Sequence, residues 1–187
     1  MVSEPHYLHC TNRMATQRVL IYLMRRDLRL SDNPVFDEVY RLSQQSQRPF
    51  THLLPLYIFA AQQMEVSGFL SEPESKSPYP EARSEIGNFW RCGPHRAKFL
   101  GESIWDLKTE LESVGSGLHI RVGRLGQAVQ DLLDQFKHEK GVSISALWMT
   151  EEEGVEEKRE ERDVRRATEK AGIDFKLWID EKYFIDE

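Results

Sequence analysis

Five short apolar runs alternate with longer segments of helical periodicity, and this alternation constrains the chain more than any other feature. The runs lie at 19–24, 52–60, 118–122, 145–149 and 175–179. The first, VLIYLM, is uniformly apolar, as is typical of a strand that is covered on both faces of a parallel sheet. Strands that alternate with helices in this way indicate βαβ units. The sequence therefore predicts an α/β fold built on a parallel sheet.

Helix signals fill the intervals between the runs. Asp32, Asn33 and Pro34 supply a capping residue and a first-turn proline for a helix that continues to about Gln44. A second helix is predicted from Lys98, because apolar residues recur at helical spacing: Leu100, Ile104, Leu107, Leu111 and Val114. Two further helices are predicted over 125–136 and 153–171.

Three features depart from the simplest α/β pattern. Pro55 interrupts the second run, which indicates an irregular or edge position. The segment at about 62–94 is rich in Ser, Pro, Glu and Gly, and its length predicts a functional or partly disordered loop. The helix at 153–171 is highly charged, and we interpret the charge as a solvated face that includes an i,i+4 pair of Glu161 and Arg165.

Composition and charge narrow the class of protein. The chain of 187 residues has a formal net charge of -6, and its excess acid lies in residues 151–187, with 14 acidic and 8 basic side chains. A chain with this balance has no general attraction for nucleic acid. Cys10 and Cys92 lack the spacing of a zinc site or a disulfide framework, which favours a reducing compartment.

The chain ends and apolar runs bear on domains and location. Residues 1–17 have no apolar signal core and are predicted to be a flexible leader, followed by one domain over 18–187. No apolar run approaches the roughly 20 residues of a membrane-spanning helix. We expect an intracellular protein of the cytoplasm or nucleus. Because of the leader, an organelle is kept as an alternative location.

Two groups of charged residues are candidates for function. Arg25–Arg29 directly follow the first run, at the edge of a parallel sheet where ligands and partner domains collect, although an internal ion cluster or a solvated loop explains them as well. No GxGxxG or GxxxxGK[ST] loop accompanies them. Glu102 lies off the apolar stripe of its helix, where it is either a solvated side chain or a hydrogen-bond partner of a heterocyclic ligand.

Two longer motifs resemble one known family. YLMRRDLRLSDNP at 22–34 is similar to the opening of the photolyase/cryptochrome family, except that Met24 stands where an aromatic residue is expected. FWRCGPHRAKFLGESIWDLKTELESVGSGLHIRVG at 89–123 is similar to the second hallmark of that family and is nearest to its DASH branch. The resemblance covers residues 19 to about 183 and implies a Rossmann-like five-stranded parallel sheet flanked by helices.

The resemblance also implies a function and a set of site residues. Such a domain holds an antenna chromophore, typically methenyltetrahydrofolate in DASH proteins, near the interface with a helical FAD domain. Glu102 matches the position whose carboxylate contacts the pterin, and Arg96, Phe99 and Ser103 are predicted to line the site. The residues predicted to face the domain interface are Arg26, Asp27 and Arg29. No catalytic or metal-binding residue is predicted.

The catalytic machinery of complete family members lies in the helical domain, which is absent from this sequence. Complete members are deoxyribodipyrimidine photolyases or blue-light receptors, so we expect this chain alone to be inactive. We expect FAD only if a helical partner is supplied separately. We expect DNA to be bound only through that partner. Two alternatives stay open. One is a scaffold that binds a helical partner through the RRDLR turn, and the other is a nucleotide-binding α/β domain with hydrolase activity.

Overall fold

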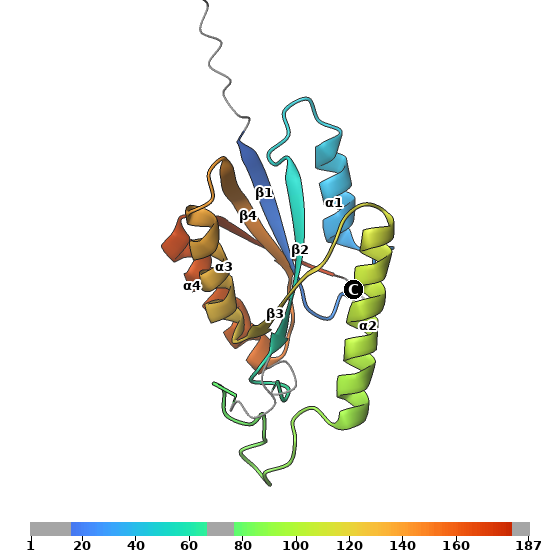
Figure 1. Ribbon diagram of the computed structural model, residues 1–187, viewed down its shortest axis with the longest axis vertical. Helices are drawn as coiled ribbons and strands as arrows, with labels where there is room; N and C mark the ends of the chain where they lie inside the picture. The colour runs from blue at the N-terminus through green and yellow to red at the C-terminus, as the bar shows by residue number, and fades with distance from the viewer. Residues whose placement is uncertain (1–15, 67–76, 181–187) are drawn as a thin grey trace, which may run out of the picture.

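A parallel sheet of five strands forms the centre of the computed structural model, which describes residues 16–66 and 77–180. The strands are β1 (Gln17–Met24), β2 (His52–Ala60), β3 (His119–Gly123), β4 (Val142–Thr150) and β5 (Asp174–Trp178). Their order across the sheet is β3-β2-β1-β4-β5, and every neighbouring pair is parallel. The predicted α/β fold with a five-stranded parallel sheet is confirmed (Figure 1).

Helices cover both faces of the sheet (Figure 1). One face carries α1 (Pro34–Ser43) and α2 (Pro94–Ser113), and the other carries α3 (Leu125–Lys137) and α4 (Val155–Ala171). The central strand β1 sends alternate side chains into the two cores: Leu20, Tyr22 and Met24 into one, Val19, Ile21 and Leu23 into the other. This double burial explains why the run is apolar throughout.

The first two helices begin where the sequence supplies suitable end residues. The side chain of Asn33 accepts hydrogen bonds from the main-chain N–H groups of Val35 at 3.0 Å and Phe36 at 3.2 Å, which caps α1 as predicted. Helix α2 begins at Pro94, earlier than the predicted start, because proline fits a first helical turn. Val114 follows the last helical residue and is 73% exposed, so its assignment to the buried stripe was wrong.

Pro55 lies in an interior strand, because β2 is flanked by β1 and β3. It pairs with Tyr22 of β1, whereas the pairing of β2 with β3 begins only at Leu56. At the level of Pro55 the strand therefore has one neighbour, and a residue without an N–H is tolerated there as at an edge. The irregular or edge position expected for Pro55 is therefore found at the proline itself, although β2 as a whole is an interior strand.

Helices α3 and α4 approach each other closely at one glycine. A Cβ atom built on Gly126 of α3 would lie 2.8 Å from the Cβ of Asp163 in α4 and 3.0 Å from the carbonyl carbon and oxygen of Asp163. These distances are shorter than ordinary van der Waals contacts, and two of the three atoms belong to the backbone. The spacing of the two helices therefore depends on the absence of a side chain at Gly126.

The long loop before α2 is described from residue 77 onward. An isolated antiparallel bridge joins Arg83 to Trp90, and the guanidinium of Arg83 lies 3.8 Å from the centre of the Trp90 ring. Residues 67–76 of the predicted loop and residues 1–15 of the predicted leader lie outside the described part of the chain. Within the described part, no helix has the length and apolar character needed to cross a membrane.

Candidate functional site

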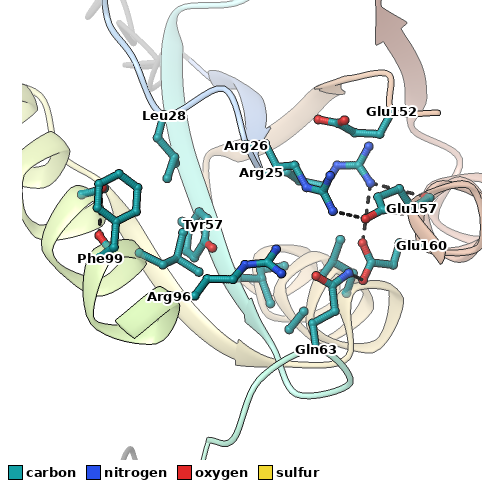
Figure 2. A pocket seen from close by; sticks show the side chains of 15 residues that line it. Arg25, Arg26, Leu28, Tyr57, Gln63, Arg96, Phe99, Glu152, Glu157 and Glu160 are labelled. Carbon is teal, nitrogen blue, oxygen red and sulfur yellow. Dashed lines mark hydrogen bonds and ion pairs between the residues drawn. The ribbon is translucent and has the colours of Figure 1, made fainter. Parts of the chain in front are cut away.

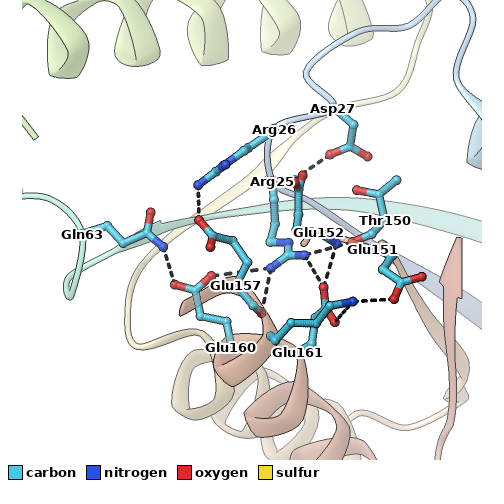
Figure 3. Close-up of polar contacts among 11 residues, drawn as sticks. Arg25, Arg26, Asp27, Gln63, Thr150, Glu151, Glu152, Glu157, Glu160 and Glu161 are labelled. Atoms are coloured by element: carbon cyan, nitrogen blue, oxygen red, sulfur yellow. Dashed lines mark hydrogen bonds and ion pairs between the residues drawn. The ribbon is translucent and has the colours of Figure 1, made fainter. Parts of the chain in front are cut away.

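The strand order of the sheet reverses between β1 and β4, and ligands of open α/β sheets bind beside the carboxyl ends of the strands at such a point. Here the position holds the side chain of Arg25, the first residue after β1 (Figure 3). Arg25 donates a hydrogen bond to the carbonyl oxygen of Thr150 at 3.0 Å and forms ion pairs with Glu161 at 2.9 Å and Glu160 at 3.6 Å. The protein's own charges fill the place of a dinucleotide pyrophosphate, which does not favour the nucleotide-binding alternative.

The acidic residues of α4 that join this ion network are buried: Glu157, Glu160 and Glu161. The interpretation of this part of the helix as a solvated face was therefore wrong. In the described residues the expected pair of Glu161 with Arg165 is absent, because Glu161 pairs with Arg25 while the Arg165 guanidinium lies 4.7 Å from the centre of the Phe175 ring. The physical reason is that this side of α4 faces the turn after β1, where Arg25 supplies a buried positive charge.

Asp27 is completely buried and holds that turn together. Its carboxylate accepts hydrogen bonds from the Tyr22 hydroxyl and, at 2.9 Å, from the main-chain N–H of Arg25. The side-chain amide of Asn33 donates to the Tyr22 oxygen at 2.9 Å, which ties the turn to the cap of α1. Burial raises the pKa of the Tyr22 hydroxyl above its ordinary value, and the negative charge of Asp27 adds to the rise, so Tyr22 remains a hydrogen-bond donor.

The two arginines on either side of Asp27 reach the surface. Arg26 forms an ion pair with Glu157, and 51% of the Arg26 side chain is exposed. Arg29 forms an ion pair with Asp180 at 2.7 Å, and 38% of its side chain is exposed. The structure thus turns the three predicted interface residues in different directions, with Asp27 inward. Their docking role stays a prediction.

A pocket of about 380 Å³ lies beside the ion network, between α2 and the carboxyl edge of the sheet (Figure 2). Its volume falls within the range of about 300–1,000 Å³ that is typical of small-molecule sites. One wall is mostly apolar and the other is charged. The lining residues are Arg25, Arg26, Leu28, Tyr57, Ile58, Ala60, Gln63, Arg96, Phe99, Leu100, Ser103, Leu125, Glu152, Glu157 and Glu160.

Three of the four predicted ligand-binding residues line this pocket. Arg96, Phe99 and Ser103 come from α2, and their spacing of three and four residues places them on one face of the helix. Glu102 is not among the lining residues. Its side chain is 67% exposed and lies 3.7 Å from the ammonium group of Lys98. The structure therefore brings the first three together and leaves Glu102 on the outer surface of α2.

The carboxylates that do line the pocket were missed by sequence reasoning: Glu152, Glu157 and Glu160. Glu152 lies two residues after β4, at the carboxyl edge of the sheet. An acidic residue at that place is a usable sequence signal, because ligands of parallel sheets gather there. Burial raises the pKa of Glu160, whereas the nearby charge of Arg25 and the hydrogen bond from Gln63 lower it.

Two buried polar atoms of this region have no hydrogen-bond partner among the described residues: Arg25 Nε and Thr150 Oγ1. An unsatisfied buried donor costs about 1–3 kcal/mol. Both atoms have almost no accessible surface, so neither opens to a molecule in the pocket. The guanidinium of Arg26, which lines the pocket and is half exposed, can donate to an organic ligand that has hydrogen-bond acceptors. Within the described ranges, no group of three or more His, Cys, Asp or Glu side chains is placed to hold a metal ion.

Comparison with known sequences identifies clear relatives. The family model described as DNA photolyase matches residues 20–181. A protein of Neurospora crassa that carries the name of a mitochondrial cryptochrome DASH is 50% identical over 174 residues, which cover 93% of this chain and 23% of that protein. A cryptochrome DASH of Xenopus laevis is 33% identical over 161 residues, which cover 86% of this chain and 25% of that protein. The chain spans about a quarter of the length of these relatives.

Solved structures show the same fold. A Synechocystis cryptochrome matches with a TM-score of 0.64 and 22% identity, covering 88% of this chain and 28% of that one. An archaeal photolyase from Sulfolobus tokodaii matches with a TM-score of 0.56 and 22% identity, covering 86% of this chain and 29% of that one. Both alignments therefore cover most of this chain and only a part of the longer protein.

Proposed function

The chain belongs to the photolyase/cryptochrome family, and from this membership we propose that it forms the antenna domain of a DASH-type cryptochrome or photolyase. The observation that carries the proposal is the pocket beside the ion network, where Arg96, Phe99 and Ser103 face charged groups of the sheet edge and of α4. Its ligand is a light-harvesting chromophore, and methenyltetrahydrofolate is the first candidate.

The pocket suits a flat heterocycle that has polar groups at one end. Leu28, Tyr57 and Phe99 supply apolar and aromatic surface. The opposite wall offers the Arg26 guanidinium as a donor and the Glu152 carboxylate as an acceptor. When bound, the chromophore supplies absorption of blue light and transfer of the excitation to a flavin. The residues of this chain bind and orient it and exclude water, and none of them is a catalyst.

The remainder of the proposed activity depends on other parts of the complete protein. FAD, the repair of cyclobutane pyrimidine dimers and the contact with DNA belong to a helical partner domain in this proposal. The Sulfolobus structure is described with two FAD molecules and a novel light-harvesting cofactor, so a flavin is a second candidate for the antenna. The name of the Neurospora relative places that protein in mitochondria, which makes this organelle one candidate compartment alongside the cytoplasm and nucleus.

Filling the pocket is expected to abolish chromophore binding. In the variant Ser103→Trp, the indole occupies the space in front of Phe99, and we expect the affinity for methenyltetrahydrofolate to fall by at least about tenfold. Absorbance and fluorescence titration of the purified full chain measures the change. Thr109→Trp is the matched control, because Ser103 and Thr109 each donate a hydrogen bond to a carbonyl oxygen four residues earlier and only Ser103 lines the pocket. Equal affinities of both variants and the unmodified chain would refute the placement.

The carboxylate that contacts the heterocycle can be identified by exchanging one oxygen. We expect Glu152→Gln to weaken binding by roughly fivefold to tenfold, the effect of one charge-assisted hydrogen bond. Glu102→Gln is expected to leave the affinity unchanged, because that side chain is exposed on the outer surface of α2. Weaker binding in Glu102→Gln alone would indicate that Glu102 contacts the heterocycle and that the binding site lies outside the pocket.

A further inference from the structure

The charged residues of the pocket form ion pairs on the α4 side, whereas the α2 side differs. On the α4 side, Glu160 is paired with Arg25 and Glu157 is paired with Arg26. Arg96 enters the pocket from α2, on the opposite side, and no ion pair of Arg96 is found among residues 16–66 and 77–180. Its guanidinium is therefore the positive group of the lining that lacks a carboxylate partner in the described structure.

Arg96 reaches into the pocket that the other two arginines line. Figure 2 shows its side chain extending from α2 into the pocket, toward the side where Gln63, Glu160 and Arg26 lie. Arg26 is attached to the turn after β1, so the two guanidinium groups come from separate elements and converge on one space. Tyr57 lines the same pocket, and burial raises the pKa of its hydroxyl while the positive charges of Arg96 and Arg26 oppose the rise.

The charge of Arg26 is shared with Glu157, whereas that of Arg96 has no carboxylate partner among the described residues, so a negative group of a ligand can pair with Arg96 and approach Arg26. The guanidinium plane carries donors in a fork that matches the oxygen pairs of carboxylates and phosphates. Arg26 keeps half of its side chain exposed, so it can bind a ligand without leaving Glu157. The apolar wall formed by Leu28, Tyr57 and Phe99 lies in the same pocket and accommodates an uncharged ring system.

From this arrangement we infer that the pocket selects ligands that carry an anionic group, a carboxylate or a phosphate, and that Arg26 and Arg96 bind this group while the ring system packs on the apolar wall. The inference rests on the proposed function and narrows it to a class of ligand. A folate supplies the anion as the carboxylates of its glutamyl tail, and a flavin nucleotide supplies it as a phosphate. A neutral pterin or riboflavin lacks it.

Two pairs of compounds test the inference on the full chain. Methenyltetrahydrofolate is compared with its derivative in which both glutamyl carboxylates are amides, and FMN is compared with riboflavin. We expect at least one anionic compound to bind about tenfold more tightly than its neutral partner, the effect of one charge-assisted contact, and the pair that shows the difference identifies carboxylate or phosphate as the source. Ligand absorbance and fluorescence report binding without any need for a light-driven reaction.

The variant Arg96→Gln is expected to remove the preference for the anionic compound and to leave the affinity for the neutral one unchanged. Lys98→Gln is the matched control, because it deletes a positive charge from the same helix, is not among the lining residues and is expected to keep the preference. Since both side chains are exposed, circular dichroism and thermal unfolding are expected to match the unmodified chain.

The outcomes separate the inference from the function on which it rests. Equal affinities for the neutral and anionic members of both pairs, with Ser103→Trp still blocking binding, would overturn the inference and leave the antenna site standing. A preference that survives in Arg96→Gln and Arg26→Gln would overturn it as well, because the anion would then be bound elsewhere. Failure of all four compounds to bind the unmodified chain would contradict the proposed function itself and the inference with it.

Discussion

Replacement of Arg25 by methionine is expected to lower the free energy of unfolding by about 3–5 kcal/mol, the range for removing one partner of a buried ion pair. The side chain of Arg25 is 8% exposed, and its loss leaves the buried carboxylate of Glu160 without its positive partner and that of Glu161 with Lys158 alone, at 3.7 Å. It also removes the donor to the carbonyl oxygen of Thr150. Urea unfolding of both proteins at neutral pH measures the difference.

The control for this prediction is Arg41→Met, which breaks an exposed ion pair with Glu38 on α1 and is expected to leave the midpoint of unfolding unchanged.

The loss of stability in Arg25→Met is expected to depend on pH. Burial raises the pKa of Glu160 and Arg25 opposes the rise, so deleting Arg25 raises the native pKa further above the unfolded value. The native state of the variant then binds the extra proton more readily, and its deficit in stability shrinks as the pH falls through the native pKa of Glu160. A deficit that does not change with pH would contradict this account.

Substitution of alanine for Gly126 is expected to destabilise the domain by about 1–3 kcal/mol, the usual cost of overpacking. The new methyl group would overlap the Cβ and the backbone carbonyl of Asp163, so α3 and α4 must separate. Helix propensity alone predicts the opposite sign, a gain of about 0.5–1 kcal/mol for glycine to alanine.

The matched control is Gly101→Ala, because Gly101 lies in α2 and a Cβ there would meet nothing within 4 Å. We expect this variant to gain stability by roughly 0.5–1 kcal/mol from propensity, so the two alanine variants differ in sign. Thermal and urea unfolding of the pair give both values. A gain in Gly126→Ala would show that the two helices can separate at little cost.

The sheet could be predicted from the sequence because each strand carries its own signal. Residues 19–24 are apolar without interruption, and a strand with helices on both faces has no solvent side to demand polar residues. The boundary of a strand is harder to predict where its apolar pattern is interrupted. Strand β4 begins at Val142, three residues before the predicted run, because Ser143 interrupts the apolar pattern and still pairs with Arg18 of β1, and the register shifts only at Ser145.

The ion network could not be predicted, because its members lie far apart in the sequence. Arg25 and Glu161 are separated by 136 positions, and nothing in the sequence near either residue indicates the partner. Charge on a helix is usually solvated, and α4 shows the pattern of such a helix. The signal that was present is the spacing of its inward side, where acids and apolar residues share one stripe: Glu157, Glu160, Glu161, Val164, Ala167 and Thr168.

Three residues of the pocket lining could be grouped from the sequence, and their role in binding stays a prediction. Arg96, Phe99 and Ser103 are three and four residues apart, so they share one face of α2. For this reason all three line the pocket together. Glu102 is adjacent to Ser103 in sequence, yet a step of one residue turns a helical side chain by about 100° and takes it to the exposed side. The opposite wall comes from β4 and α4, and only the packing of these elements against the turn after β1 brings Glu152 and Glu160 to it.

The filled position between β1 and β4 limits how this domain could be redesigned. A glycine-rich phosphate loop grafted in place of the turn after β1 would point a pyrophosphate at two buried carboxylates, Glu160 and Glu161, that had lost Arg25. The repulsion between the pyrophosphate and these carboxylates would act in the interior, where salt screens charges poorly. The backbone conformation of a glycine-rich loop would not reduce it. Conversion to a dinucleotide-binding protein therefore requires neutral replacements on α4 before any change in the loop, and the order of these steps is set by charge.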